Sequence, residues 1–119
     1  MPLTREPTAP RKARACIRKL LGDRVSEEFS EDAVLLTSEL VTNAVMYAPN
    51  GCRLSAWFVR GSRALRVEVA DACADAPEVR EAAPSQVGGR GLQLVQSRST
   101  KWGVSSNPWG KSVWFELRR

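Results

Sequence analysis

The chain has 119 residues, which fits a single domain. Its hydrophobic (43%) and charged (26%) fractions are typical of soluble globular proteins, and no apolar run approaches the ~20 residues of a membrane-spanning helix. The absence of histidine excludes Ser-His and Cys-His catalysis and any metal site that depends on imidazole. Three scattered cysteines predict neither a disulfide framework nor a zinc site, so we expect a cytoplasmic protein.

The net charge of +5 suits a polyanionic partner. Much of the positive charge lies near the start of the chain, between residues 5 and 19. We do not expect nucleic acid as a partner, because no basic patch is interleaved with aromatic residues and no helix-turn-helix signal is present. We do not expect a membrane either, because no apolar run is long enough to span one. A solvated basic face is the simplest interpretation, and a triphosphate or an acidic protein would fit as well.

The first half of the chain predicts two helices. Apolar residues recur at helical spacing from residue 10 to residue 21, and Gly22 follows as a stop signal. A second helix is predicted from about Ser30, a good N-cap, to about Tyr47. Phe29 before this cap and Val34 inside the helix have the spacing of a hydrophobic staple.

The second half predicts two hairpins and a third helix. Strands are expected at residues 53–60, 64–70, 101–105 and 112–117, and a short helix at 92–97 after the glycines of 88–91. Residues 72–87 show no period and predict a long loop of the functional or disordered kind. We therefore expect an α+β protein, a two-layer α/β sandwich. A mixed, mostly antiparallel sheet of four to five strands would pack on three helices in one domain, residues 10–119, after a tail of residues 1–9.

Glu39 and Asn43 lie four residues apart inside the second predicted helix, and hence on one face of it. A carboxylate can orient or deprotonate a hydroxyl, and an amide oxygen can ligate Mg²⁺. Taken alone, the pair is equally consistent with two polar residues on a surface helix.

Two further features have the chemistry of a nucleotide site. Asp71 follows a strand in which every second residue (65, 67 and 69) is apolar, and position 71 continues that alternation, so its carboxylate should point inward. An inward carboxylate could accept a hydrogen bond from an adenine amino group. The glycines of 88–91 open a helix, where free N–H groups and the helix dipole favour phosphate. Each has a simpler alternative, a turn residue for Asp71 and a chain bend for the glycines.

Together these segments resemble the GHKL ATPase superfamily, and within it the bacterial anti-sigma-factor serine/threonine kinases. The N-box of that family is similar to SELVTNAVMYA (38–48). Its first glycine box resembles VEVADAC (67–73), and its second resembles GGRGLQLV (88–95). Its closing hairpin resembles KWGV (101–104) and GKSVWFEL (110–117).

The resemblance implies a histidine-kinase-like ATPase fold that binds ATP and Mg²⁺. Glu39 would be the general base, Asn43 the Mg²⁺ ligand and Asp71 the adenine-binding residue. Ser112 stands where the family often has a threonine that helps to hold the adenine. Lys111 next to it could reach a phosphate, although a lysine facing solvent is the simpler expectation.

The resemblance also assigns the phosphate side of the site. The residues of the second glycine box that would contact nucleotide are Gly89, Arg90, Gly91 and Leu92. In the first glycine box Cys73 would lie beside the nucleotide, but Cys73 and Asp75 occupy positions that are usually glycine. The loss of glycine flexibility there favours weakened binding.

By resemblance, the partners would be a sigma factor and an anti-anti-sigma protein, with a homodimer also allowed. One hypothesis is therefore an ATP-dependent protein serine kinase that also sequesters a sigma factor. The alternative is a binding module with a degenerate ATP site that acts by sequestration alone. The few residues before Pro10 leave open whether the family's first edge strand is present.

Overall fold

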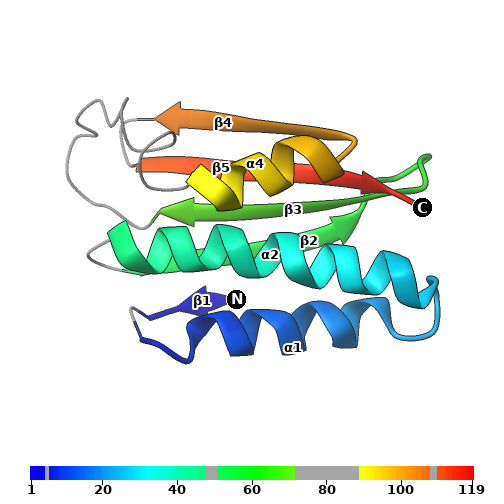
Figure 1. Cartoon of the computed structure of the whole chain (residues 1–119), viewed down its shortest axis with the longest axis horizontal. Helices are drawn as coiled ribbons and strands as arrows, with labels where there is room; N and C mark the ends of the chain where they lie inside the picture. Colours follow the sequence, from blue (N-terminus) through cyan, green and yellow to red (C-terminus); the bar gives the residue numbers. More distant parts are fainter. Residues whose placement is uncertain (5, 48–50, 72–88, 108–109) are drawn as a thin grey trace.

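The computed structural model describes residues 1–4, 6–47, 51–71, 89–107 and 110–119. Three helices lie on one face of a five-stranded sheet (Figure 1). The helices are α1 (Ala9–Leu21), α2 (Glu27–Tyr47) and α4 (Gly89–Arg98). The strands are β1 (Pro2–Leu3), β2 (Cys52–Phe58), β3 (Ala64–Asp71), β4 (Lys101–Asn107) and β5 (Gly110–Arg118).

The sheet has the order β1-β2-β3-β5-β4, and the four pairings between these strands are antiparallel. The predicted two-layer α+β sandwich is therefore confirmed, with a fully antiparallel rather than a mixed sheet in the described residues. Residues 2 and 3 supply the first edge strand, which pairs with the start of β2. Leu3 of this strand is buried in the core, so the predicted tail contributes to the fold.

The helices are stabilised because their apolar residues recur every three or four positions, which places them on one face of the helix, against the core. In α1 the buried residues are Ala9, Ala13, Ile17 and Leu21, a spacing of four throughout. Helix α2 begins three residues earlier than the predicted Ser30. The hydroxyl oxygen of Ser26 accepts a hydrogen bond from the N–H of Phe29 at 3.1 Å and so performs the capping role. The expected staple is wrong for the same reason, since Phe29 lies inside the helix.

Most of the remaining elements extend beyond their predicted bounds, whereas β2 ends at Phe58, before the predicted residue 60. Helix α4 begins at Gly89 rather than at residue 92, so the glycines form its first turn instead of preceding it. Strands β4 and β5 continue past the predicted ends towards the turn that joins them. The backbone ladder continues through residues whose side chains are polar, and side-chain periodicity does not reveal that pairing.

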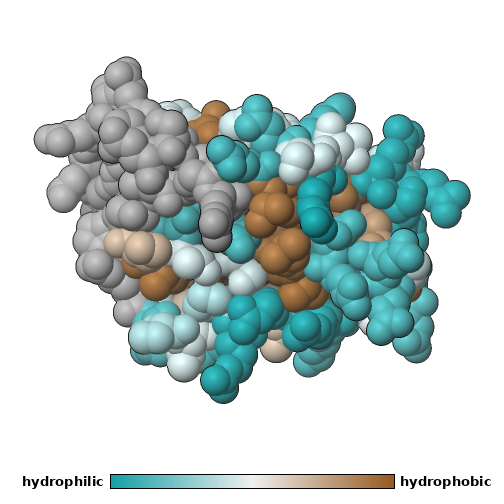
Figure 2. Space-filling view, in the orientation of Figure 1, coloured by the Kyte–Doolittle hydropathy of each residue, from teal (hydrophilic) through white to brown (hydrophobic). Residues whose placement is uncertain are grey.

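The hydrophobic core lies between the helices and the inner face of the sheet, the face that the helices cover. Its strand residues alternate along the chain and include Leu54, Leu65, Val67, Val69, Phe115 and Leu117. Most of the surface on the helix side is hydrophilic, and the apolar surface there gathers where α2 faces α4 (Figure 2). Within the described ranges, no helix has the length and apolar character that a bilayer crossing requires.

The outer face of the sheet has a polar centre. The Arg66 guanidinium donates to the carboxylates of Glu68 at 2.7 Å and Glu116 at 2.8 Å, and it lies 3.9 Å from the centre of the Trp114 ring. Gly103 on β4 leaves room for that ring, because a Cβ there would come within 2.7 Å of it. This cluster lies on the face opposite the helices and is structural in kind.

Candidate functional site

Four elements meet at one end of the sandwich, on the left in Figure 1. Helix α2 ends there, strand β3 ends there, and β5 and α4 both begin there. Apart from Cys73, the residues predicted for a nucleotide site belong to these elements. The fold therefore brings segments from positions 39 to 112, up to 73 residues apart in the sequence, to one end of the molecule.

Helix α2 presents Glu39 and Asn43 on its α4 side. Asp32 marks that side, because its carboxylate accepts a hydrogen bond from Arg98 of α4 at 3.2 Å. Each residue of a helix turns the chain by about 100°, so Glu39 and Asn43 return to within about 20° of the direction of Asp32. Both residues are half-buried. The carboxylate and the amide are thus stacked one turn apart along the border between α2 and α4.

The N-terminus of α4 lies level with this pair. Helices α2 and α4 run in opposite directions, and Arg98 at the end of α4 contacts Asp32 near the start of α2 (Figure 1). Going back along α4 to Gly89 covers about 13.5 Å, and the same distance along α2 from Asp32 leads to about residue 41. The unpaired N–H groups of the first turn of α4 are therefore close to the level of Asn43.

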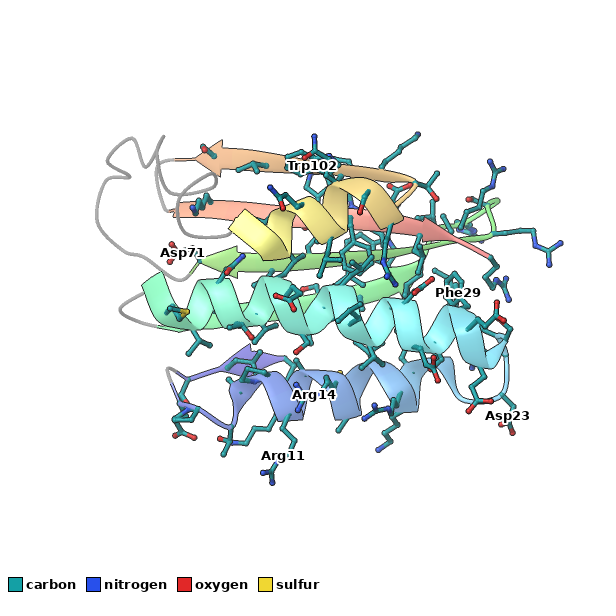
Figure 3. The ribbon with its side chains drawn as sticks, viewed as in Figure 1. Arg11, Arg14, Asp23, Phe29, Asp71 and Trp102 are labelled. Atoms are coloured by element: carbon teal, nitrogen blue, oxygen red, sulfur yellow. The ribbon has the colours of Figure 1, made fainter. Side chains whose placement is uncertain are left out.

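Asp71 occupies the last position of β3, at the same end of the sheet (Figure 3). It has the parity of the buried Val67 and Val69, and its cross-strand partner is Cys52 of β2. Burial of the Cys52 thiol, together with the negative charge of Asp71, raises the pKa of Cys52 to about 11. The carboxylate of Asp71 is therefore within electrostatic reach of a buried, inward-facing thiol, as expected for an inward acid.

Ser112 is not brought to this face. In β5, Val113, Phe115 and Leu117 point into the core, so Ser112 has the opposite parity and shares the outer face with Trp114. Lys111, one position earlier, has the inward parity and is half-buried. The expectation of a solvent-facing Lys111 is therefore wrong, and the period of two along β5 is the signal that identifies it.

Other predicted site residues fall partly or wholly outside the description. Cys73 lies outside the described residues. Gly89, Arg90, Gly91 and Leu92 are described as the backbone of the first turn of α4, and the side chains of Arg90 and Leu92 lie outside the description. What the structure establishes for this segment is the position of a helix N-terminus, which is the feature that favours an anion.

The donor set suits Mg²⁺ bound through a nucleotide rather than a metal held by protein alone. Within the described ranges, no group of three or more Cys, Asp or Glu side chains is arranged to hold a metal ion. Magnesium commonly takes one or two protein oxygens and completes its octahedron with phosphate oxygens and water. A single amide oxygen from Asn43, beside a helix N-terminus that attracts phosphate, fits that requirement.

The sequence model of the family described as "Histidine kinase-like ATPase domain" matches residues 3–117, nearly the whole chain. The chain belongs to this family. No curated protein matches it significantly. Three solved structures, each below 25% identity to this chain, share its fold, and the likeness shows the fold alone.

The histidine kinase domain of the Erythrobacter litoralis EL346 blue-light activated histidine kinase has 23% identity and a TM-score of 0.61, with 93% of this chain and 59% of that domain covered. The longer EL346 kinase has 23% identity and a TM-score of 0.64, with 99% and 42% covered. Full-length ShkA in complex with AMPPNP has 18% identity and a TM-score of 0.55, with 98% and 30% covered. This chain therefore spans less than two thirds of the length of each of these three chains.

Proposed function

We propose that this histidine kinase-like ATPase domain is an ATP-binding anti-sigma regulatory protein with serine/threonine protein kinase activity towards an anti-anti-sigma partner. One observation carries the proposal. The Glu39–Asn43 side of α2, the inward Asp71 and the N-terminus of α4 meet at one end of the sandwich. Family membership and the resemblance of the sequence motifs to anti-sigma kinases support it.

Each residue has a distinct role in this proposal. Asp71 accepts a hydrogen bond from the adenine amino group, and the first turn of α4, with Gly89 and Gly91, holds phosphate oxygens through backbone N–H groups. Asn43 supplies an amide oxygen to Mg²⁺, which when bound neutralises phosphate charge.

In this proposal Glu39 acts as the general base. It lies one turn before Asn43 on the same side of α2, so its carboxylate is close to the metal ligand. In the proposed reaction it accepts the proton of the substrate serine hydroxyl as that oxygen attacks the γ-phosphorus of ATP. The bond between the γ-phosphorus and the β,γ-bridging oxygen breaks, and ADP leaves with its electron pair. Because the chain lacks histidine, a carboxylate is the natural base for this step.

A second candidate function is sequestration by a binding module with a degenerate ATP site. The observation that favours it is the presence of Cys73 and Asp75 where the first glycine box usually has glycine. In this alternative the same fold binds a sigma factor, and Glu39 performs no chemistry. The two candidates share the fold and differ in phosphoryl transfer.

Calorimetric titration with ATP and Mg²⁺ tests the shared part. Asp71→Asn should weaken ATP binding by about tenfold or more, because it replaces a charged acceptor by a neutral amide. Asp23→Asn is the matched control, since Asp23 is exposed at the opposite end of the molecule (Figure 3). Asn43→Ala should remove the gain in affinity that Mg²⁺ gives. Equal binding by all four proteins would overturn the nucleotide site.

Phosphoryl transfer separates the two candidates. Anti-anti-sigma proteins encoded in the same genome are incubated with ATP, Mg²⁺ and either the wild-type protein or Glu39→Gln. Phosphoserine is then measured by mass spectrometry. The kinase proposal predicts phosphoserine with the wild-type protein and a loss of at least about 100-fold in rate with Glu39→Gln. Sigma-factor binding by both proteins without any phosphoserine would establish sequestration alone.

A further inference from the structure

Lys111 lies on the inner face of the sheet, at the end where the candidate nucleotide site is built. It is the second residue of β5, and its parity is that of Val113, Phe115 and Leu117, which pack in the core. The other three lysines of the chain, at positions 12, 19 and 101, are described and are exposed, whereas Lys111 is half-buried. Lysine is seldom buried without a partner, so its position calls for a polar group on this face.

The strand register places Lys111 beside Asp71. Ala70 of β3 and Ser112 of β5 form the last pair of this antiparallel ladder, and continuing the same register by one residue would set Asp71 opposite Lys111. Side chains of directly opposed residues have Cβ atoms about 5 Å apart and stand on the same face. On the other side of β3, Asp71 is opposite Cys52, which is buried. Asp71 thus has an apolar thiol on one flank and an ammonium donor on the other.

An acceptor next to a donor matches more than one purine edge. Adenine presents its N6 amino group as a donor and the adjacent N1 as an acceptor. Guanine and hypoxanthine present N1–H as a donor and the adjacent O6 as an acceptor. A carboxylate alone accepts from adenine but repels O6, because both are acceptors. A flexible lysine beside that carboxylate removes the repulsion, since its three N–H donors reach O6 as readily as N1.

We propose that Lys111 is part of the base subsite and that, together with Asp71, it extends the substrate class of this site to 6-oxopurine nucleoside triphosphates. This inference rests on the proposed nucleotide site and adds a residue and a substrate class to it. Lys111 donates to the acceptor atom of the purine edge, N1 of adenine or O6 of guanine and hypoxanthine. Asp71 accepts from the neighbouring N–H group in each case.

The test is a set of affinities for ATP, GTP and ITP with Mg²⁺, measured for the wild-type protein, Lys111→Met, Lys111→Arg and Lys101→Met. Lys111→Met keeps an unbranched side chain only one atom shorter and removes the donors. Lys101→Met removes the same charge from an exposed position on β4 and is the matched control. Circular dichroism and thermal midpoints establish that each variant is folded, and Lys111→Arg retains a cation at the site if the methionine variant does not fold.

We expect the wild-type protein to bind GTP and ITP within about tenfold of ATP. Lys111→Met should weaken GTP and ITP binding by about tenfold or more beyond its effect on ATP, because O6 then faces the carboxylate without a donor. Lys101→Met and Lys111→Arg should leave the ratios close to those of the wild-type protein.

Different failures separate this inference from the proposed function. Absence of binding by any triphosphate would overturn both. Tight ATP binding with GTP and ITP more than about 100-fold weaker would overturn the inference alone. An equal loss for all three nucleotides in Lys111→Met would also overturn it and would show that the lysine contacts a phosphate, which every triphosphate shares.

Discussion

Thr37 lies in the middle of α2 with no exposed surface, and its hydroxyl oxygen has no hydrogen-bond partner among the described residues. A buried threonine in a helix usually donates to the carbonyl four residues earlier. A hydroxyl buried without a partner loses its hydrogen bonds to water and gains nothing in return. Replacing Thr37 by valine, which has a methyl group in place of the hydroxyl, should therefore stabilise the protein.

The expected gain follows from this burial. Removing an unsatisfied buried hydroxyl should raise the free energy of unfolding by about 1–2 kcal/mol, the lower part of the range for the cost of burying such a group without a partner. Threonine and valine have similar helix propensities, so that contribution nearly cancels. For a domain of this size, a gain of this order raises the thermal midpoint by about 4–8 °C.

Urea denaturation of Thr37→Val and Thr37→Ser measures the effect. Thr37→Ser keeps the hydroxyl and removes the methyl group, so it should destabilise the protein by about 1 kcal/mol. Nucleotide affinity should not change in either variant, because Thr37 points about 140° away from the direction of Asp32 and the α4 side of α2. Destabilisation by Thr37→Val of 1 kcal/mol or more would refute the reasoning and show that the hydroxyl has a partner.

Three other predictions concern the frame around the site. Gly51→Ala should lose at least about 1 kcal/mol more stability than Gly61→Ala. Both glycines have positive φ, but only at Gly51 would a Cβ meet backbone, 2.2 Å from the Leu3 carbonyl oxygen; equal losses would contradict this. Arg66→Met should destabilise by about 1–2 kcal/mol in urea titrations without changing nucleotide affinity, since it leaves two carboxylates on the outer face unpaired; an unchanged midpoint would count against the cluster. The pKa of Cys52 is raised from its ordinary value of 9.0 to about 11, so its contribution to stability is complete below pH 9 and is lost as the pH rises to 11. The unfolding free energy of Cys52→Ala should therefore fall less between pH 9 and pH 11 than that of the wild-type protein. The same slope in both proteins would rule out this contribution from Cys52.

The main elements can be predicted from the sequence because their periods are strong. Leu65, Val67 and Val69 alternate cleanly and form the inner side of β3, and the four-residue spacing of buried residues in α1 is visible in the chain. The start of α2 is not predictable in the same way. Ser26 and Ser30 are both suitable N-cap residues, because two acidic residues follow each of them. In the structure Ser26 is the N-cap, and Phe29 is then inside the helix and buried in the core.

The candidate site is predictable in part for a similar reason. Spacing alone places Glu39 and Asn43 on one side of a helix, and strand parity points Asp71 inward. That α4 lies against the same side of α2 is a tertiary fact, which the contact between Asp32 and Arg98 shows and the spacing of residues along the chain does not. That Lys111 rather than Ser112 has the inward parity follows from the alternation of Val113, Phe115 and Leu117 along β5, which a comparison of motifs alone does not take into account.

The central claim is that a nucleotide binds at the end of the sandwich where α2 and β3 end and α4 and β5 begin. Amide NMR spectra recorded during a titration with ATP and Mg²⁺ test it most directly. We predict shifts concentrated in residues 39–46, at Asp71, in the first turn of α4 and at Lys111, with the outer-face cluster of Arg66 and Trp114 unchanged. Shifts confined to α1 or to the outer face, or none at millimolar ATP, would contradict the account.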